Sequence, residues 1–464
     1  MADLERLVDA LRQDGGTVRE AGPEDAVDGV PAAVVARPAS ADGVAAVLRE
    51  ATAQGLVTVA RGAGTALDWG APPERVDLVL DTTGLDRLVE HGAGDLVVVA
   101  EAGLPVATLL ERVRGAAQEL VVDLPPERLA GGSTVGGALS TGASGPRRLQ
   151  RGGIRDLVLG ATVVLADGTV ASSGGKVVKN VAGYDLAKLL TGAYGTLGVV
   201  VRAAFRLHPV RPDRAFVVAS GPPADVAARA RAVVASQLAP AAVEIDRPAG
   251  SDAAEVAVLL EGTGTAVGER AAVAAELLGG RVRAEAPAWW AAVPGSSAAA
   301  AGGTWGAAGR KGSLRGAAGS GSTGASGEAG ASGRAGAADG SECEPVETYA
   351  KATATLTGVA GLLAAAREAE QRYGVGVALR GTAAGVLHAV VTGTPGATAS
   401  AVGHLREAAP SPREGTVTVL RAPREVRAAL DAWGPVGGLD LMRAVKRQLD
   451  PGRNLAPGRF VGGI

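Results

Sequence analysis

The sequence has little of several residue types on which whole function classes depend. Cys343 is the single cysteine among 464 residues, so an internal disulfide framework and a cysteine-cluster metal site are both excluded. One cysteine also fits a reducing cytoplasm. Aromatic residues make up 3% of the chain, so we expect a core built mainly from valine, leucine and alanine. The formal net charge of -2 argues against a strongly basic nucleic-acid binder.

Long hydrophobic runs are missing as well. No stretch approaches the ~18 uninterrupted apolar residues that would indicate a membrane span. The N-terminal segment MADLERLVDALRQDGG is charged and amphipathic, unlike a signal peptide. We therefore expect a cytoplasmic protein, with membrane contact at most peripheral and through a partner.

Glycine, by contrast, is abundant. The chain holds 69 glycines, about twice the usual share of ~7%. Apolar residues reach 47%, which is normal for a globular protein, and the length predicts two or three domains.

Hydrophobic periodicity divides the chain near Pro209 and Pro212. Before them we expect helices at 3–13, 42–54, 106–114 and 185–190, and strands at 56–60, 76–80, 95–101, 157–166 and 198–207. Residues 125–155 show little regular periodicity. From 213 to about 430, strand-like and helix-like segments alternate, which indicates a sheet with helices on one face. Residues 295–342, rich in Ala, Gly and Ser, are predicted to be a disordered insertion. A helix is expected at 439–449, followed by an irregular tail.

Four glycine-rich segments stand where a backbone could approach a ligand: 61–65, 131–145, 174–185 and 192–200. Glycines permit positive φ angles, and consecutive N–H groups can form an anion-binding nest. Lys179 could pair with a bound anion, but each segment also has a purely structural interpretation, as a turn, a flexible loop, or a loop held by a salt bridge between Lys179 and Asp185. None is a Rossmann fingerprint, because Leu67 stands where the third glycine of GxGxxG would be, and no P-loop motif occurs.

Together these segments resemble a known family. Between about residues 55 and 210, and above all in SGPRR, GGIRDLVLGATVVLADGTV and GGKVVKNVAGYDLAKLLTGAYGTLGVVVRAAFRLHPV, the chain is similar to the flavin-binding domain of the vanillyl-alcohol oxidase/para-cresol methylhydroxylase (PCMH) superfamily. Within it, the resemblance is to the FAD-binding accessory (E) subunits of bacterial glycolate oxidases. A weaker similarity lies at residues 449–460.

The resemblance implies an α+β fold. We expect a two-subdomain PCMH-type FAD-binding domain at 1–211, an α+β cap domain with an antiparallel sheet at 212–430, and a C-terminal segment at 431–464 that returns to the FAD domain. It also implies which residues bind FAD: Arg61, Gly62, Ala63, Gly64, Thr65, Thr134, Val135, Gly136, Gly137, Thr141, Ser144, Gly145, Gly195, Val199 and Val200.

Departures from the family pattern narrow this expectation. Covalent members use a histidine in the first loop or a cysteine in the second, whereas this chain has Ala66 and Leu67 in the first and no cysteine near the second. FAD should therefore be non-covalent. Ala456 stands where the family has the asparagine of Asn-Pro-Gly, with Asn454 two residues earlier, so one expected flavin contact is in doubt.

Catalytic residues are harder to name. Related 2-hydroxy-acid dehydrogenases have a histidine-rich metal cluster, but His388 has no second ligand at metal spacing, so we predict no metal and a buried or half-buried strand histidine. Arg147, Arg148 and Arg151 could bind a carboxylate, although we favour exposed surface charges. Trp289 and Trp290 fit a pocket, a partner interface or an anchor of the cap. No residue is identified as a base.

Three functions remain. The favoured one is an FAD-binding subunit of a glycolate oxidase-like complex, which relays electrons while a homologous FAD-bearing subunit oxidises glycolate to glyoxylate and an iron–sulfur subunit carries the electrons onward. The second is a self-sufficient FAD-dependent dehydrogenase of a 2-hydroxy acid or an alcohol. The third is a non-redox scaffold subunit with vestigial FAD loops.

Overall fold

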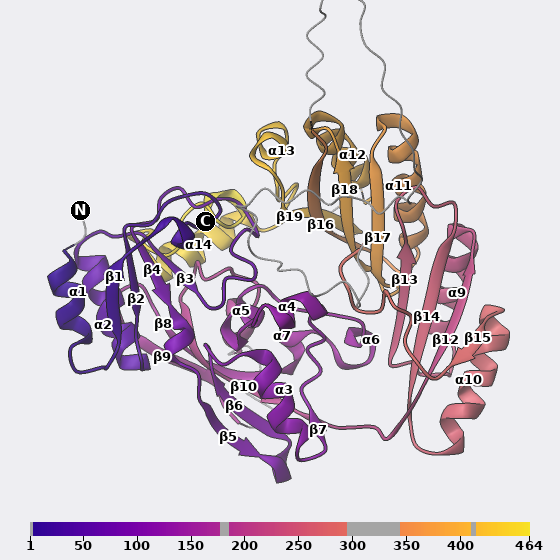
Figure 1. The fold of residues 1–464 in the computed structure, drawn as a ribbon, viewed down its shortest axis with the longest axis horizontal. Coiled ribbons are helices and arrows are strands. Elements are labelled where there is room, and N and C mark those ends of the chain that lie inside the picture. Colours follow the sequence, from indigo (N-terminus) through magenta and orange to yellow (C-terminus); the bar gives the residue numbers. More distant parts are fainter. Residues whose placement is uncertain (1–2, 177–184, 295–343, 410–413) are drawn as a thin grey trace, which may run out of the picture.

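The computed structural model describes residues 3–176, 185–294, 344–409 and 414–464. Two sheets from the N-terminal half of the chain stand beside one large sheet from the C-terminal half, and the C-terminal helix α14 (Leu439–Leu449) returns to the first sheet (Figure 1). The predicted disordered insertion at 295–342, Cys343 and Lys179 lie outside the described residues.

The first sheet has the strand order β1-β2-β4-β3 and is mostly parallel. Helices α1 and α2 pack on it, and Val44, Val47 and Leu48 of α2 share a core cluster with Leu78 of β4. That spacing is the apolar stripe of an amphipathic helix. The elements are α1 (Leu4–Leu11), β1 (Thr17–Glu20), β2 (Val34–Arg37), α2 (Ala41–Ala53), β3 (Thr58–Arg61) and β4 (Leu78–Asp81).

The second sheet is antiparallel, with the order β5-β6-β10-β8-β9. Its strands are β5 (Leu88–Gly92), β6 (Val97–Glu101), β8 (Val158–Val164), β9 (Val170–Gly174) and β10 (Val199–Arg206), and β7 (Gln118–Glu119) pairs separately with β11 (His208–Pro209). The accompanying helices are α3 (Val106–Arg114), α4 (Pro126–Ala130), α5 (Val135–Ser140), α6 (Arg148–Arg151), α7 (Ile154–Leu157) and α8 (Ala187–Leu190). Single 3₁₀ turns lie at η1 (Pro23–Asp25), η2 (Thr82–Gly84), η3 (Ala93–Asp95) and η5 (Val461–Gly463).

The third sheet, which we call the cap sheet, is antiparallel in the order β15-β12-β14-β13-β17-β18-β16-β19. Its strands are β12 (Asp213–Gly221), β13 (Ala242–Arg247), β14 (Ala254–Gly262), β15 (Arg281–Arg283), β16 (Val346–Ala354), β17 (Gly376–Thr382), β18 (Val386–Gly393) and β19 (Gly415–Arg421). Its helices are α9 (Pro223–Ala235), α10 (Thr265–Leu278), α11 (Val359–Tyr373), α12 (Pro395–Glu407) and α13 (Arg424–Ala429).

The two faces of the cap sheet differ in chemistry. Ala350, Leu379 and Leu387 are buried in one valine-, leucine- and alanine-rich cluster with α9 to α12. Because side chains alternate along a strand, the neighbouring Lys351 and His388 point to the opposite face, toward the FAD-domain side of the molecule. The predicted sheet with helices on one face is confirmed.

A buried ion pair holds the C-terminal tail to the loop before β10. Lys446 Nζ donates to Asp450 Oδ2 at 2.6 Å and to the carbonyls of Thr196 and Leu455, both at 2.8 Å. Asp450 in turn accepts from the backbone N–H of Asn454 and Leu455. This network fixes the loop before β10 and the tail relative to each other.

Most predicted elements are confirmed, with boundaries that shift by a few residues. The helices at 106–114 and 439–449 have the predicted bounds. Residues 125–155, expected to be irregular, instead contain α4 to α7. These helices have four to six residues, too few turns to produce a 3.6-residue pattern in the sequence. Searched over the described residues, no helix has the length and apolarity that a membrane crossing needs.

The Lys446–Asp450 pair generates a stability prediction. Replacing Asp450 by Asn leaves a buried ammonium group without its counter-charge, so we expect the free energy of unfolding to fall by roughly 3–5 kcal/mol in denaturant titrations. Asp440→Asn, which removes the exposed partner of Arg443 on the same helix, is the matched control and should leave the unfolding midpoint unchanged. Equal midpoints for both variants would show that the tail does not depend on this pair.

Candidate functional site

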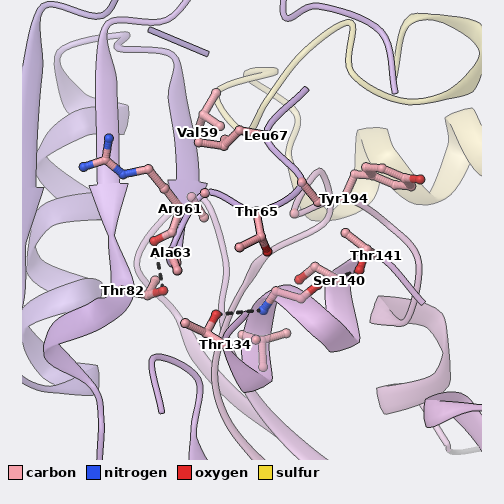
Figure 2. Close-up of a pocket in the computed structure, with 18 of the residues that line it drawn as sticks. Val59, Arg61, Ala63, Thr65, Leu67, Thr82, Thr134, Ser140, Thr141 and Tyr194 are labelled. Atoms are coloured by element: carbon pink, nitrogen blue, oxygen red, sulfur yellow. Dashed lines mark hydrogen bonds between the residues drawn. The ribbon is translucent and has the colours of Figure 1, made fainter. Parts of the chain in front are cut away.

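A cleft opens where the loop after β3, helix α5, the segment before β10 and the tail meet (Figure 2). We call it the glycine cleft. It is lined by residues 59–67, Thr82, Arg128, Thr134, Gly136, Gly137, Ser140, Thr141, Tyr194, Gly195, Gly198, Val199, Val200 and Arg459.

Nearly all of the residues predicted to bind FAD line this cleft. The exceptions are Val135, the first residue of α5, which is buried in the core, and Ser144 and Gly145, which line neighbouring cavities. The structure therefore brings the first, second and fourth glycine-rich segments together. Most of the third, at residues 177–184, lies outside the described residues.

Arg61 lines the cleft with its backbone, while its side chain is used elsewhere. The guanidinium donates to Asp25 Oδ1 at 2.8 Å and to Asp81 Oδ2 at 3.1 Å, and Figure 2 shows it pointing away from Thr65 and Thr134. The Arg61 carbonyl accepts a hydrogen bond from the Thr82 hydroxyl at 3.0 Å. Arg61 thus fixes the start of the loop.

Two glycine positions leave no room for a side chain. A Cβ on Gly62 would lie 2.2 Å from Thr134 Oγ1, and one on Gly136 would lie 2.8 Å from the Ala102 Cβ. The Thr134 hydroxyl accepts from the Gly137 N–H at 3.2 Å and so caps α5. The first loop consequently packs directly on the beginning of α5.

Beyond Gly62, the loop has free hydrogen-bond donors. None of the backbone N–H groups of residues 63–66 donates to another described residue. Arg459, 3% exposed, has an Nη1 without a partner in the described chain, and its Nη2 donates to the Trp69 carbonyl at 2.7 Å. Burial lowers the pKa of Arg459. The cleft therefore presents several unused donors and a buried cation, as an anion-binding site does.

Tyr194 lies at one end of the cleft, and its backbone is strained. It has a φ of +55°, a left-handed conformation that costs a non-glycine residue about 1–3 kcal/mol. Its ring lies 5.6 Å from Trp433 and 5.9 Å from Phe460, so the tail holds it in place. Burial raises the pKa of Tyr194 to about 12, and the phenol stays neutral.

A smaller cavity adjoins the glycine cleft and shares Arg128, Thr141 and Tyr194 with it. We call it the inner cavity. It measures about 60 Å³, less than half of the ~150 Å³ that holds a benzene. Its other lining residues are Trp69, Leu124, Pro125, Gly142, Ala143, Ser144, Tyr349, Lys351, His388 and Leu420. The FAD-domain side and the cap sheet both contribute to it.

Two cations of the inner cavity lack a counter-ion. Arg128, 4% exposed, has no carboxylate partner among the described residues; its Nη2 donates to the Thr141 hydroxyl at 3.5 Å, and its Nε makes no hydrogen bond there. Its guanidinium lies 4.6 Å from the centre of the Trp69 ring. Lys351 Nζ also makes no hydrogen bond or ion pair with a described residue. Burial lowers the pKa of both groups. Buried unpaired charges are costly, so this arrangement favours an anionic ligand.

His388 and Tyr349 form a hydrogen-bonded pair in the cavity wall. The Tyr349 hydroxyl and His388 Nδ1 are 2.8 Å apart, and the two rings stack with their centres 5.4 Å apart. Burial, helped by the charge of Lys351, lowers the pKa of His388 to about 3. The imidazole is therefore neutral near pH 7 and has a lone pair available. The prediction of a buried or half-buried strand histidine is confirmed.

The prediction of exposed surface charges at Arg147, Arg148 and Arg151 is wrong. All three are partly buried. Arg147 is bound by Asp123 at 2.7 Å and Glu119 at 2.6 Å, which leaves it no capacity for a ligand carboxylate. Arg148 donates to Ser144 Oγ at 2.7 Å beside a wider cavity that Lys351 also lines.

The tryptophan pair packs on the cap sheet. Trp290 contacts Phe216 of β12 edge-to-face, and Trp289 Nε1 donates to Glu255 of β14. The segment that follows reaches α4, where the Val293 N–H donates to Glu127 at 3.1 Å. Within the part of the chain that the structure describes, no group of three or more His, Cys, Asp or Glu residues could hold a metal ion.

Comparison with known proteins agrees with this geometry. Residues 31–174 match the FAD binding domain family. The chain is 36% identical to the D-lactate dehydrogenase of Archaeoglobus fulgidus over 211 residues, 46% of either protein. It is 37% identical to the glycolate oxidase subunit GlcE of Escherichia coli over 122 residues, 26% of this chain and 34% of GlcE. The matched regions thus span less than half the length of these relatives.

The fold has a wider match. The solved structure of p-cresol methylhydroxylase with substrate bound aligns with 98% of this chain and 95% of its own, with a TM-score of 0.65 and 16% identity. At that identity the likeness concerns the fold alone, and it bears out the predicted α+β architecture with a PCMH-type domain.

The residues present fit FAD. A pyrophosphate dianion needs dense N–H donors, which residues 63–66 supply, and a nearby cation, which Arg459 supplies. Gly62 and Gly136 let the first loop pack on Thr134 and the beginning of α5 pack on Ala102, which holds these donors in place. The chain therefore carries an FAD binding domain at residues 31–174, set in the fold of p-cresol methylhydroxylase.

Proposed function

We propose that this chain is an FAD-dependent oxidoreductase that oxidises a small 2-hydroxy acid to the 2-oxo acid at its own inner cavity. The observation that carries the proposal is a pair of cations without a carboxylate partner among the described residues, the buried Arg128 and the half-buried Lys351, beside the neutral His388 in a cavity that adjoins the glycine cleft. The similarity to a D-lactate dehydrogenase supports the same substrate class.

The three parts of the chain have separate tasks in this proposal. Residues 1–211 bind FAD through the predicted residues that line the glycine cleft, with Arg459 added from the tail. Residues 212–430 form the cap and contribute Tyr349, Lys351 and His388. Residues 431–464 return to close the cleft.

Six residues that line the inner cavity then have a chemical role. Arg128 and Lys351 bind the substrate carboxylate, because a guanidinium and an ammonium both donate charge-assisted hydrogen bonds. His388 accepts the hydroxyl proton as the alcohol is oxidised. Trp69, Leu124 and Leu420 keep water away. FAD, when bound, would accept the two electrons that leave the substrate.

A second candidate is the FAD-bearing subunit of a glycolate oxidase-like complex, favoured by the GlcE match. In this version the partners are a homologous FAD-bearing subunit that oxidises glycolate and an iron–sulfur subunit. The inner cavity would then be a remnant and would not turn over substrate.

One experiment separates the two candidates. The FAD-loaded chain is mixed anaerobically with D-lactate or glycolate, and the oxidised-flavin absorbance is followed. We expect it to bleach, because the inner cavity supplies both carboxylate binding and a base. A stable flavin spectrum in the presence of every acid tried would favour the relay subunit.

The FAD site itself is tested at Gly62. Gly62→Ala places a methyl group against Thr134, so we expect FAD affinity to fall roughly tenfold or more, in line with the ~1–3 kcal/mol cost of overpacking. Titration of apo-protein by quenching of FAD fluorescence gives the affinity. Gly94→Ala is the control, since its Cβ would meet no atom within 4 Å. Equal affinities for both variants would remove the loop from the binding site.

The next prediction concerns Arg128 and Lys351, the residues proposed to bind the substrate carboxylate. Lys351→Met and Arg128→Met should each lower kcat/KM for D-lactate or glycolate about 10- to 100-fold, since a hydrogen bond to a charged group contributes roughly 1.5–3 kcal/mol. FAD content and unfolding midpoint report on folding. Lys188→Met, in an exposed ion pair with Asp185, is the matched control. Unchanged kinetics in both anchor variants would rule out carboxylate binding in this cavity.

A further inference from the structure

Behind the inner cavity lies a second small cavity, which we call the sheet cavity. It measures about 40 Å³ and lies between the cap sheet and the turn at Gly145. One water needs only ~10–15 Å³ of such space, so the cavity has room for a hydrogen-bonded water chain. Tyr349, His388 and Ser144 line both cavities. The hydrogen-bonded Tyr349–His388 pair is therefore the wall between them.

Glu244 stands on the far side of the sheet cavity. It belongs to β13, is 4% exposed, and its Oε1 makes no hydrogen bond with any described residue. In the strand register Glu244 faces Thr382, and Thr382 faces Val386 of β18, two residues from His388. A buried carboxyl without a partner is expensive to maintain, and its neighbour Asp246 on the same strand shows the alternative, a close ion pair with Arg380 at 2.7 Å.

We propose that Glu244 is a positioning residue that receives, across the sheet cavity, the proton that His388 takes from the substrate hydroxyl. This inference rests on the proposed function. Glu244 does not touch substrate or FAD and acts only through the Tyr349–His388 pair.

The proton transfer balances along this route. In the tautomer in which His388 Nδ1–H donates to the Tyr349 oxygen, Nε2 has the free lone pair and takes the hydroxyl proton of the substrate. Nδ1 passes its proton to Tyr349, whose own hydroxyl proton leaves into the sheet cavity. The Glu244 carboxylate accepts it and becomes a neutral acid. FAD, when bound, would accept the two electrons and the hydrogen of the substrate carbon.

The surroundings of Glu244 make it a better proton acceptor than an exposed carboxylate. Burial raises the pKa of Glu244 well above its usual value, so its carboxylate binds a proton more readily. The charged and titratable groups that face it come from five elements or loops: Asp123, Arg148, Tyr349, Arg380 and His388. The charge of Asp123 raises the pKa further, while those of Arg380 and Arg148 lower it.

Proton transfer to Glu244 predicts that the rate of flavin reduction falls on the acid side of its pH profile, which we call the acid limb. Below the pKa of Glu244 the group is already protonated and cannot accept, so flavin reduction should slow as the pH falls through that value. His388, whose pKa is about 3, would place a limb only at much lower pH. The position of the limb therefore identifies which group produces it.

The test compares the FAD-loaded wild type with Glu244→Gln and Glu244→Asp by anaerobic stopped flow across pH, using D-lactate or glycolate. Gln cannot accept a proton, so we expect its limiting reduction rate to fall about 10- to 100-fold, at or below the ~10²–10⁴ contribution of a general base. KM should stay unchanged and the acid limb should disappear. Asp should restore part of the rate and the limb.

Glu261→Gln is the matched control. Glu261 lies on β14, is also partly buried, has a pKa raised by burial, and does not line the sheet cavity. We expect its rate and pH profile to match the wild type. Equal profiles for Glu244→Gln and Glu261→Gln would overturn the proposal.

A second readout does not depend on turnover. Infrared difference spectra of the FAD-loaded chain should show a carboxylic acid band that grows as the pH falls, persists above the usual range of an exposed glutamate, and is absent in Glu244→Gln. A wild type with no such band would overturn the proposal by itself. If no hydroxy acid reduces the flavin, both the proposed function and the proton transfer to Glu244 are wrong. If the wild type is reduced normally and Glu244→Gln has an unchanged pH profile, only the proton transfer to Glu244 is wrong.

Discussion

The site depends on one constraint: along each strand of the cap sheet, side chains alternate between the two faces of the sheet. In β13, β16, β17 and β18, every second side chain enters the apolar cluster under α9 to α12, and the others face the FAD-domain side. Charged side chains on the face toward the FAD-domain side need partners or a ligand, because isolated buried charges are costly. Arg380 and Asp246 pair at 2.7 Å, while neither Lys351 nor Glu244 forms an ion pair with a described residue. This contrast separates structural charges from those that we assign to chemistry.

Both halves of the chain contribute to the site, and neither half contains it alone. The glycine cleft is built by loops around β3, α5 and β10, whereas Lys351 and His388 come from cap strands. Arg128 of α4 lines both the cleft and the inner cavity, so a molecule bound there would lie beside both. The tail completes the cleft with Arg459, and the buried Lys446–Asp450 pair holds that tail to the loop that carries Thr196.

Much of the fold could be predicted from the sequence, and part of the site could not. Long elements such as α3 and α14 produce a clear apolar period, while α4 to α7 are too short to do so. Arg147 was misjudged because Asp123 and Glu119, its partners, lie more than twenty residues away along the chain. Neither Arg128 nor Lys351 lies in a glycine-rich segment or a known motif. Lys351 did give a signal: one of six lysines, it stands in the strand segment YAKATA, where a charge on a buried face needs a reason.

The sequence by itself determined the glycine loops, the apolar periods and, through their order, the FAD binding domain, because backbone conformation and burial follow from local residue types and their spacing. Only the tertiary structure decided which charges are paired, since an ion pair depends on residues that folding brings together from distant segments. It also decided that Tyr349 and His388 form a wall between two cavities, with Lys351 on one side and Glu244 on the other. Cavities arise between elements, and no local pattern in a sequence records them.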